Sequence, residues 1–134
     1  MSGVLVDSNV ILDVLTDDGE WLDWSAAMLE ECSQQGPLVI NPIIYAEVAA
    51  GFTAIEDLDD AVPPSWLRRD PLPWESAFLA GHSFSRYRRR GGARRSPLPD
   101  FYVGAHASVA GLTLLTRDAR RYRTYFPKLK LIAP

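Results

Sequence analysis

Four acidic residues stand out in this sequence because of where they lie along it. Asp7 directly follows a short apolar run, and Asp118 comes soon after another. Glu47 and Asp100 lie between them, in segments expected to be helical. An acid at the carboxyl end of a buried strand sits where open α/β sheets bind their ligands, and several acids at one edge repel unless a cation joins them. The four positions therefore predict a divalent metal site.

Such a site suits the hydrolysis of phosphodiester bonds. The reaction needs an activated water, neutralisation of the negative charge on the phosphoryl oxygens and stabilisation of the leaving oxygen. One or two Mg²⁺ or Mn²⁺ ions can provide all three. Carboxylates are the hard oxygen ligands that these ions prefer. Zinc is disfavoured because Cys32, His82 and His106 are dispersed, without a closely spaced ligand pair. We assign neither histidine a role and interpret His106 as a packing residue of an apolar helix.

Each acid also has a structural explanation that the sequence leaves open. Asp7 could cap the helix that follows it, and Glu47 could face solvent. Asp100 could be favoured by the positive end of a helix, and Asp118 could be a turn residue. Asn9 could orient the acids by hydrogen bonding or could cap the helix. The joint pattern favours the metal site because it is more specific than any single position.

The elements that would position these residues alternate between strands and helices. Apolar runs predict strands at 4–6, 38–40, 113–116 and 129–132. Helical spacing and caps predict helices at 10–15, 20–35, 42–52, 54–62, 74–90 and 100–110, with a turn or short helix at 117–122. Alternation of this kind predicts parallel pairing through right-handed crossovers. We expect a single domain over residues 1–134, a three-layer α/β/α sandwich around a mainly parallel sheet.

The amino-acid composition argues against several other classes of protein. The chain has 134 residues, of which 47% are hydrophobic and 23% charged, which argues against disorder. Cys32 is the single cysteine, so an intramolecular disulfide is excluded and a reducing cytoplasm is the expected compartment. No apolar run approaches the roughly 20 residues that span a bilayer, so we expect no membrane partner.

Charge is distributed unevenly along the chain. Residues 1–67 hold 13 of the 17 acidic residues and no Lys or Arg, which gives the two halves formal charges of −13 and +10. A cluster of arginines lies around the end of the helix predicted at 74–90 and on both sides of Gly91 and Gly92. Its members are Arg86, Arg88, Arg89, Arg90, Arg94 and Arg95. Arginine can grip phosphate with two hydrogen bonds and stack on unpaired bases, so we interpret the cluster as an RNA-binding surface. The alternative is favourable placement of cations at a helix C-terminus.

Several of these motifs together resemble a known family. The segments are 4–13 (VLVDSNVILD), Glu47, 98–107 (LPDFYVGAHA) and 114–118 (LLTRD). In order and spacing they resemble a PIN-domain ribonuclease, particularly a VapC-type toxin of a type II toxin-antitoxin system. The resemblance spans nearly the whole chain. The basic segment through 91–95 is longer and more basic than the family pattern.

The resemblance implies an α/β/α fold, Mg²⁺- or Mn²⁺-dependent endonuclease activity on RNA, a homodimer and a cognate antitoxin whose tail commonly crosses the acidic site. The family's acidic quartet falls on Asp7, Glu47, Asp100 and Asp118, with Asn9 and Thr116 as supporting polar residues. We expect the three aspartates to bind the metal directly or through water. Glu47 would complete the site or orient the attacking water.

Two other functions compete with this one. Haloacid dehalogenase-like phosphatases also begin with a strand that ends in Asp, but they need a second Asp two residues later, where this chain has Asn9. A catalytically inactive PIN-like module that only binds RNA remains the alternative. The four intact acids argue against it.

Overall fold

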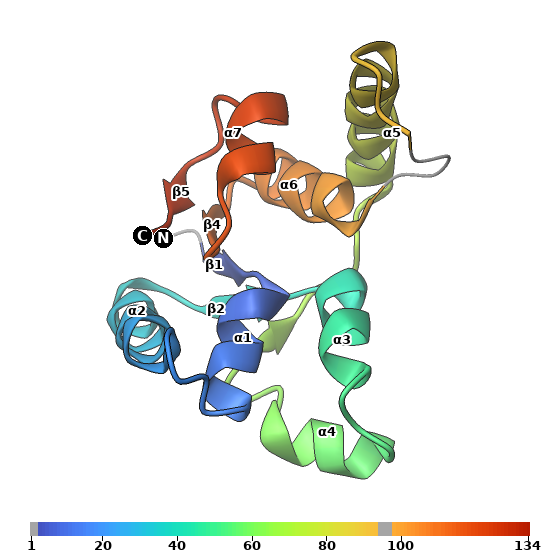
Figure 1. The fold of residues 1–134 in the computed structure, drawn as a ribbon. Helices are drawn as coiled ribbons and strands as arrows, with labels where there is room; N and C mark the ends of the chain where they lie inside the picture. Colours follow the sequence, from blue (N-terminus) through green and yellow to red (C-terminus); the bar gives the residue numbers. More distant parts are fainter. Residues whose placement is uncertain (1–2, 94–97) are drawn as a thin grey trace.

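A parallel β-sheet lies at the centre of the computed structural model, which describes residues 3–93 and 98–134 (Figure 1). Its strands pair in the order β3-β2-β1-β4-β5. They are β1 (Val4–Val6), β2 (Leu38–Ile40), β3 (Arg68–Arg69), β4 (Thr113–Leu115) and β5 (Leu131–Ile132). Each neighbouring pair is parallel, so the predicted parallel pairing is confirmed and holds for every described strand.

Helices cover the sheet on both sides. They are α1 (Ser8–Leu15), α2 (Leu22–Gln35), α3 (Pro42–Ala49), α4 (Ile55–Ala61), α5 (Trp74–Arg89), α6 (Pro99–Ala110) and α7 (Arg120–Tyr125). In Figure 1, α1 to α4 gather in the lower half and α5 to α7 in the upper half, with the strands between them. The predicted three-layer arrangement is therefore confirmed. None of the described helices is long and apolar enough to cross a membrane.

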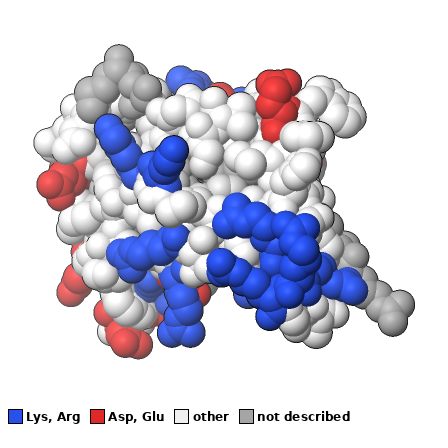
Figure 2. All heavy atoms as spheres, turned by 90° about the horizontal axis from the view of Figure 1, so that it is seen from above, with Lys and Arg blue, Asp and Glu red and all other residues white. Residues whose placement is uncertain are grey.

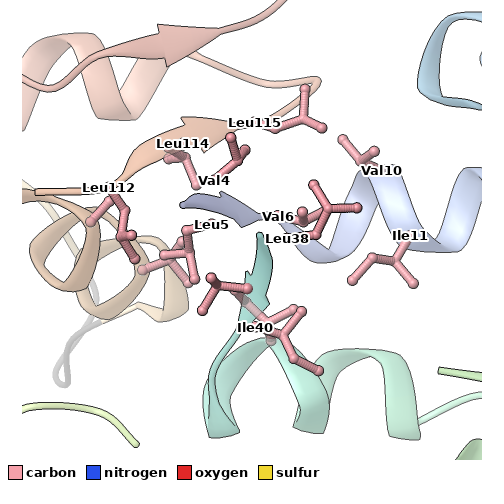
Figure 3. Packing of buried hydrophobic residues seen from close by; sticks show 14 of the residues in the cluster. Val4, Leu5, Val6, Val10, Ile11, Leu38, Ile40, Leu112, Leu114 and Leu115 are labelled. Carbon is pink, nitrogen blue, oxygen red and sulfur yellow. The ribbon is translucent and has the colours of Figure 1, made fainter. Parts of the chain in front are cut away.

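The central strand β1 is buried because it pairs on both edges and is covered on both faces. All three of its residues are at most 5% exposed, and Figure 3 shows them packed with Val10 and Ile11 of α1 and with Leu114 of β4. A continuous apolar run is what a strand buried on both faces requires. Cys32 of α2 is also buried in this core.

Chain breakers set the ends of the helices that follow and precede strands. Asn41 caps α3, with its side-chain oxygen accepting a hydrogen bond from the Ile44 N–H at 2.9 Å, and Pro42 occupies the first turn. Gly111 ends α6 with φ 69°, a left-handed conformation that glycine adopts readily. These local signals place the strand ends to within one or two residues.

Two strands differ from the sequence prediction by more than one residue, and β4 ends one residue earlier than predicted. β3 was not predicted, because Arg68 and Arg69 are both exposed and show no apolar pattern. It forms by pairing with β2 at the sheet edge, where charged side chains discourage pairing with other chains. β5 is shorter than predicted because Leu129 lies in a turn, where its N–H donates to the Phe126 carbonyl at 3.0 Å.

The strand order creates a switch point beside β1. The chain runs outward from β1 through β2 to β3, then returns to form β4 on the other side of β1. Open α/β sheets bind ligands at such a point, outside the carboxyl ends of the strands. Asp7 and Thr116 leave the sheet there, and the Asp7 N–H still donates to the Leu115 carbonyl at 2.9 Å.

Candidate active site

Asp7 is the most buried of the four predicted acids, with 4% of its surface exposed. Its Oδ1 accepts a hydrogen bond from the Ser8 N–H at 2.8 Å, so the helix-cap interpretation is correct for this oxygen. Oδ2 accepts from two hydroxyls, those of Thr116 at 2.9 Å and Tyr122 at 2.8 Å. Burial raises the pKa of Asp7, the two hydroxyls oppose this, and repulsion from Asp100 adds to it.

Asp100 lies in the first turn of α6, facing Asp7 across Tyr122. Its Oδ1 is 3.4 Å from the Tyr122 hydroxyl, and its Oδ2 is 3.3 Å from Nη1 of Arg121. Burial raises the pKa of Asp100 even though Arg121 lowers it, and repulsion from Asp118 adds to the rise. The positive end of a helix would favour the ionised carboxylate, so the position at a helix start alone does not account for the raised pKa of Asp100.

Glu47 reaches the site from α3. It is half-buried, and its Oε1 accepts a hydrogen bond from the Ser8 hydroxyl at 3.1 Å, so it is not a freely solvated surface acid. Burial raises the pKa of Glu47, and repulsion from Asp7 and Asp100 raises it further. Its side chain therefore belongs to the same electrostatic group as those two aspartates.

Asp118 lies at the outer margin, in the loop between β4 and α7. Its N–H donates to the Thr116 hydroxyl oxygen at 3.1 Å, which fixes the loop, while its carboxylate is exposed. Asp100 and Asp118 line an open cavity of about 460 Å³. The remaining lining residues are Tyr87, Arg120, Arg121, Thr124 and Tyr125.

The structure thus brings the four predicted acids to one edge of the sheet, but not into a closed cage. Within residues 3–93 and 98–134, no three Asp, Glu, His or Cys side chains are close enough to form a metal-ligand group. The oxygen donors and the mutual repulsion of the acids nevertheless fit Mg²⁺ or Mn²⁺. These ions are held by one or two carboxylates and keep several waters, so a complete protein cage is not required.

Comparison with known families shows which kind of protein this site belongs to. Residues 4–127 match the family model described as PIN domain. The chain belongs to the PIN domain family. The resemblance inferred from the motifs is confirmed at this level. No curated protein matches the sequence.

Solved structures share the fold of this PIN domain over nearly its whole length. VapBC2 from Rickettsia felis, bound to a promoter DNA fragment, has a TM-score of 0.75 at 17% identity, covering 98% of each chain. FitAcB from Neisseria gonorrhoeae has a TM-score of 0.72 at 18% identity and 96% coverage of each chain. A toxin-antitoxin complex from Klebsiella pneumoniae gives 0.63 at 20% identity and 90% of each chain. Likenesses at such low identity establish the fold.

Asn9 and Thr116 join the two segments that meet at the switch point of the PIN domain. The Asn9 amide donates to the Thr116 hydroxyl oxygen at 3.3 Å, and its Oδ1 accepts from the Arg117 N–H at 3.1 Å. Asn9 lies inside α1, which Asp7 caps, so the helix-cap interpretation of Asn9 is wrong. Both residues have the placement expected of groups that orient the acids.

An ion pair between the buried Asp13 and the partly exposed Arg117 lies beside this junction and was not predicted. Asp13 is 2% exposed and accepts two hydrogen bonds from the Arg117 guanidinium, at 2.8 and 2.9 Å, and one from the Ser25 hydroxyl at 2.7 Å. Breaking such a pair leaves a buried charge unpaired, which is strongly destabilising. The pair holds the loop before Asp118 against α1 and α2. An acid among the apolar residues of α1 was the available signal.

Three further contacts of the site were also missed. Ser8 binds Glu47, Tyr122 binds Asp7, and Arg121 pairs with Asp100. Tyr122 and Arg121 belong to α7, which spans Arg120–Tyr125, whereas the sequence predicted a turn or short helix at 117–122.

Two described members of the arginine cluster lie near the acid-lined cavity, and Figure 2 shows a broad cationic area on the face formed by α5 to α7. Arg86 and Arg90 lie over the Tyr125 ring, with 5.6 and 5.7 Å between guanidinium carbon and ring centroid. Arg88 and Arg89 lie at the same end of α5, where cations also suit the helix C-terminus. Arg94 and Arg95 lie outside the described residues.

The two histidines have partners other than the four acids. His106 is buried, with Nδ1 2.9 Å from the Asn41 amide nitrogen, and so links α6 to α3 as a packing residue. His82 is exposed beside the Phe78 ring. A larger cavity of about 760 Å³ lies near the amino ends of β4 and β5, where its lining includes Lys128 and Lys130 but no acid, histidine or cysteine.

The raised pKa of Glu47 makes a prediction about stability. An acid with a raised pKa in the folded state loses stabilisation as pH rises through that pKa. In EDTA at pH 7.5, Glu47→Gln should therefore raise Tm by roughly 3 °C, from a gain below about 1 kcal/mol for this half-buried group. At pH 4 the difference should vanish. Thermal unfolding measures both values.

The matched control is Glu30→Gln, which removes the same charge from the exposed surface of α2, away from the helix N-terminus. It should leave Tm nearly unchanged at both pH values. A Glu47→Gln protein no more stable than wild type at pH 7.5 would contradict the electrostatic description of the site.

Proposed function

We propose that this PIN domain is a metal-dependent endoribonuclease that hydrolyses RNA phosphodiester bonds and serves as the toxin of a toxin-antitoxin pair. The observation that carries the proposal is the mutual repulsion of Asp7, Glu47 and Asp100 at the switch point of the sheet. Acids that raise one another's pKa destabilise the folded protein when they are ionised, unless a bound cation compensates their charges.

The site residues would have different roles in this reaction. Asp7, Asp100 and Asp118 would hold Mg²⁺ or Mn²⁺, which supplies charge neutralisation and Lewis-acid chemistry when bound. Glu47 would complete the site or orient the attacking water, and its raised pKa favours it as an acceptor of that water's proton. The hydroxyl of Thr116 holds the Asp7 carboxylate in place.

The competing function is a PIN-like module that binds RNA without cutting it. The two functions share the cationic face and differ in what the acids do. The convergence of four intact acids favours cleavage, because RNA affinity alone gains nothing from negative charge beside the phosphates.

Cleavage should depend on both the acids and the metal. We expect purified protein to cut RNA with Mg²⁺ or Mn²⁺ and to be inactive in EDTA. Asp7→Asn and Asp100→Asn should each reduce the cleavage rate by about 100-fold or more, because each removes a metal ligand. Gel-resolved cleavage of a labelled RNA measures the rates.

Asp60→Asn, an exposed acid on α4, is the control and should cut at the wild-type rate. Cleavage that persists in EDTA, or full activity in both acid variants, would refute the mechanism. Metal-independent RNA binding by an inactive wild-type protein would favour the competing function.

The cationic face is proposed to hold the RNA backbone. Arg86 and Arg90 are the best-placed members of the proposed RNA-binding surface. Their cation–π contacts with Tyr125 hold their guanidinium groups near the cavity that Asp100 lines. A guanidinium held over an aromatic ring can still direct N–H groups outward, in its own plane, for phosphate contacts. Arg120 and Arg121 line the same cavity. We retain Arg88, Arg89, Arg94 and Arg95 as further proposed RNA contacts.

Removing two of these charges should weaken RNA binding in a salt-dependent way. For Arg86→Gln with Arg90→Gln, the slope of log K against log salt should shrink by about 1.4, because each lost phosphate contact removes about 0.7 for a single strand. Binding of single-stranded RNA in EDTA, measured by fluorescence anisotropy at several salt concentrations, tests this. Arg68→Gln with Arg69→Gln removes equal charge from edge strand β3 and should leave the slope unchanged. Equal slopes in both double variants would place the RNA elsewhere.

Two protein partners belong to the proposal: a cognate antitoxin and a second copy of the chain. The structurally similar K. pneumoniae protein was solved in a toxin-antitoxin complex, which supports the first. An apolar stripe on α5 is compatible with the second, since Trp74 and Phe78 are 88% and 71% exposed. We place the protein in the cytoplasm, where the single thiol of Cys32 stays reduced.

The antitoxin should be the product of an adjacent open reading frame. We expect that product, expressed together with this chain, to copurify with it and to suppress RNA cleavage. An unrelated protein of similar size and charge serves as the control. A neighbouring product that neither binds the chain nor suppresses cleavage would contradict the toxin assignment while leaving the nuclease assignment intact.

A further inference from the structure

Tyr122 of α7 is a buried residue with an unusual hydroxyl position. The residue is 1% exposed, and its hydroxyl lies between two acids, 2.8 Å from Oδ2 of Asp7 and 3.4 Å from Oδ1 of Asp100. A phenol has one hydrogen to donate. The shorter distance assigns that hydrogen to Asp7, so Asp100 lies against the hydroxyl without receiving a full hydrogen bond.

This arrangement makes the two oxygens of Asp7 unequal. A carboxylate has about four lone-pair sites, two on each oxygen. Oδ2 accepts from both Thr116 and Tyr122, so its sites are filled, whereas Oδ1 accepts only the Ser8 N–H among the described contacts. Oδ1 therefore keeps a lone pair for another partner.

The position of Tyr122 depends on a glycine of α6. A Cβ atom added to Gly104 would lie 2.5 Å from the Phe126 ring and 3.1 Å from the Tyr122 ring. The absence of a side chain there lets α7 approach α6 closely. Gly104 is one helical turn after Asp100, so the same close contact brings the Tyr122 hydroxyl to that acid.

We propose that Tyr122 is a positioning residue for the metal: its hydroxyl holds Oδ2 of Asp7, which would leave Oδ1 available as a metal ligand, and it spaces Asp7 from Asp100. The inference rests on the proposed function, because it concerns the metal of the same site. Groups that hydrogen-bond to metal ligands fix their orientation, and their loss typically weakens metal binding by 10- to 100-fold.

The test measures Mn²⁺ binding to the full chain without RNA. Tyr122→Phe keeps the ring and removes the hydroxyl, so the Kd for Mn²⁺ from calorimetry or electron paramagnetic resonance should rise by about 10-fold or more. The matched control is Tyr45→Phe, which also removes a tyrosine hydroxyl that donates to an aspartate, Asp59, at 2.8 Å. Its Mn²⁺ Kd should equal that of wild type.

Two further readouts separate positioning from loss of structure. RNA affinity in EDTA should be unchanged in Tyr122→Phe, and saturating Mn²⁺ should recover a large part of its cleavage rate. Thr116→Val removes the other hydroxyl from Oδ2 and should raise the Mn²⁺ Kd in the same direction. It carries the test if Tyr122→Phe does not fold.

The outcomes distinguish this inference from the function on which it rests. Wild-type protein that binds Mn²⁺ and a folded Tyr122→Phe that binds it equally well would overturn the inference alone. Wild-type protein that binds no Mn²⁺ would overturn the metal-dependent function and the inference together.

Discussion

The burial of one carboxylate, that of Asp7, is the constraint on which the rest of the site depends. A carboxylate taken out of water must be supplied with hydrogen-bond donors, or it takes up a proton. The donors come from α1, from the residue after β4 and from α7. They can meet because β4 pairs directly with β1, so the strand order that buries the core also brings hydrogen-bond donors to the acid.

The acids and the elements that carry them were readable from the sequence for local reasons. Asp7 directly follows an apolar run that only a doubly covered strand explains, and Pro42 and Gly111 mark helix ends through their own backbone preferences. The same reasoning gave the parallel topology. None of these inferences needs knowledge of how two helices pack against each other.

The parts that escaped prediction depend on packing between distant segments. The Arg117 and Asp13 pair joins residues separated by 104 positions, and Tyr122 reaches the acids only because Gly104 lets two helices approach. β3 escaped for another reason, since two exposed arginines carry no apolar pattern and become a strand only through β2. Periodicity along the chain contains no information about such contacts.

The junction at the switch point also determines when during folding the site can exist. Thr116 and Asp7 are 109 positions apart in the chain, and Tyr122 and Asp7 are 115 positions apart. Contacts between such distant segments form only after a large loss of chain entropy, and domains grow from the N-terminus during synthesis. A ribosome-bound or truncated chain lacking β4 and α7 therefore carries Asp7 without the Thr116 and Tyr122 hydroxyls, and the acidic edge becomes complete only after both of those segments have been synthesised.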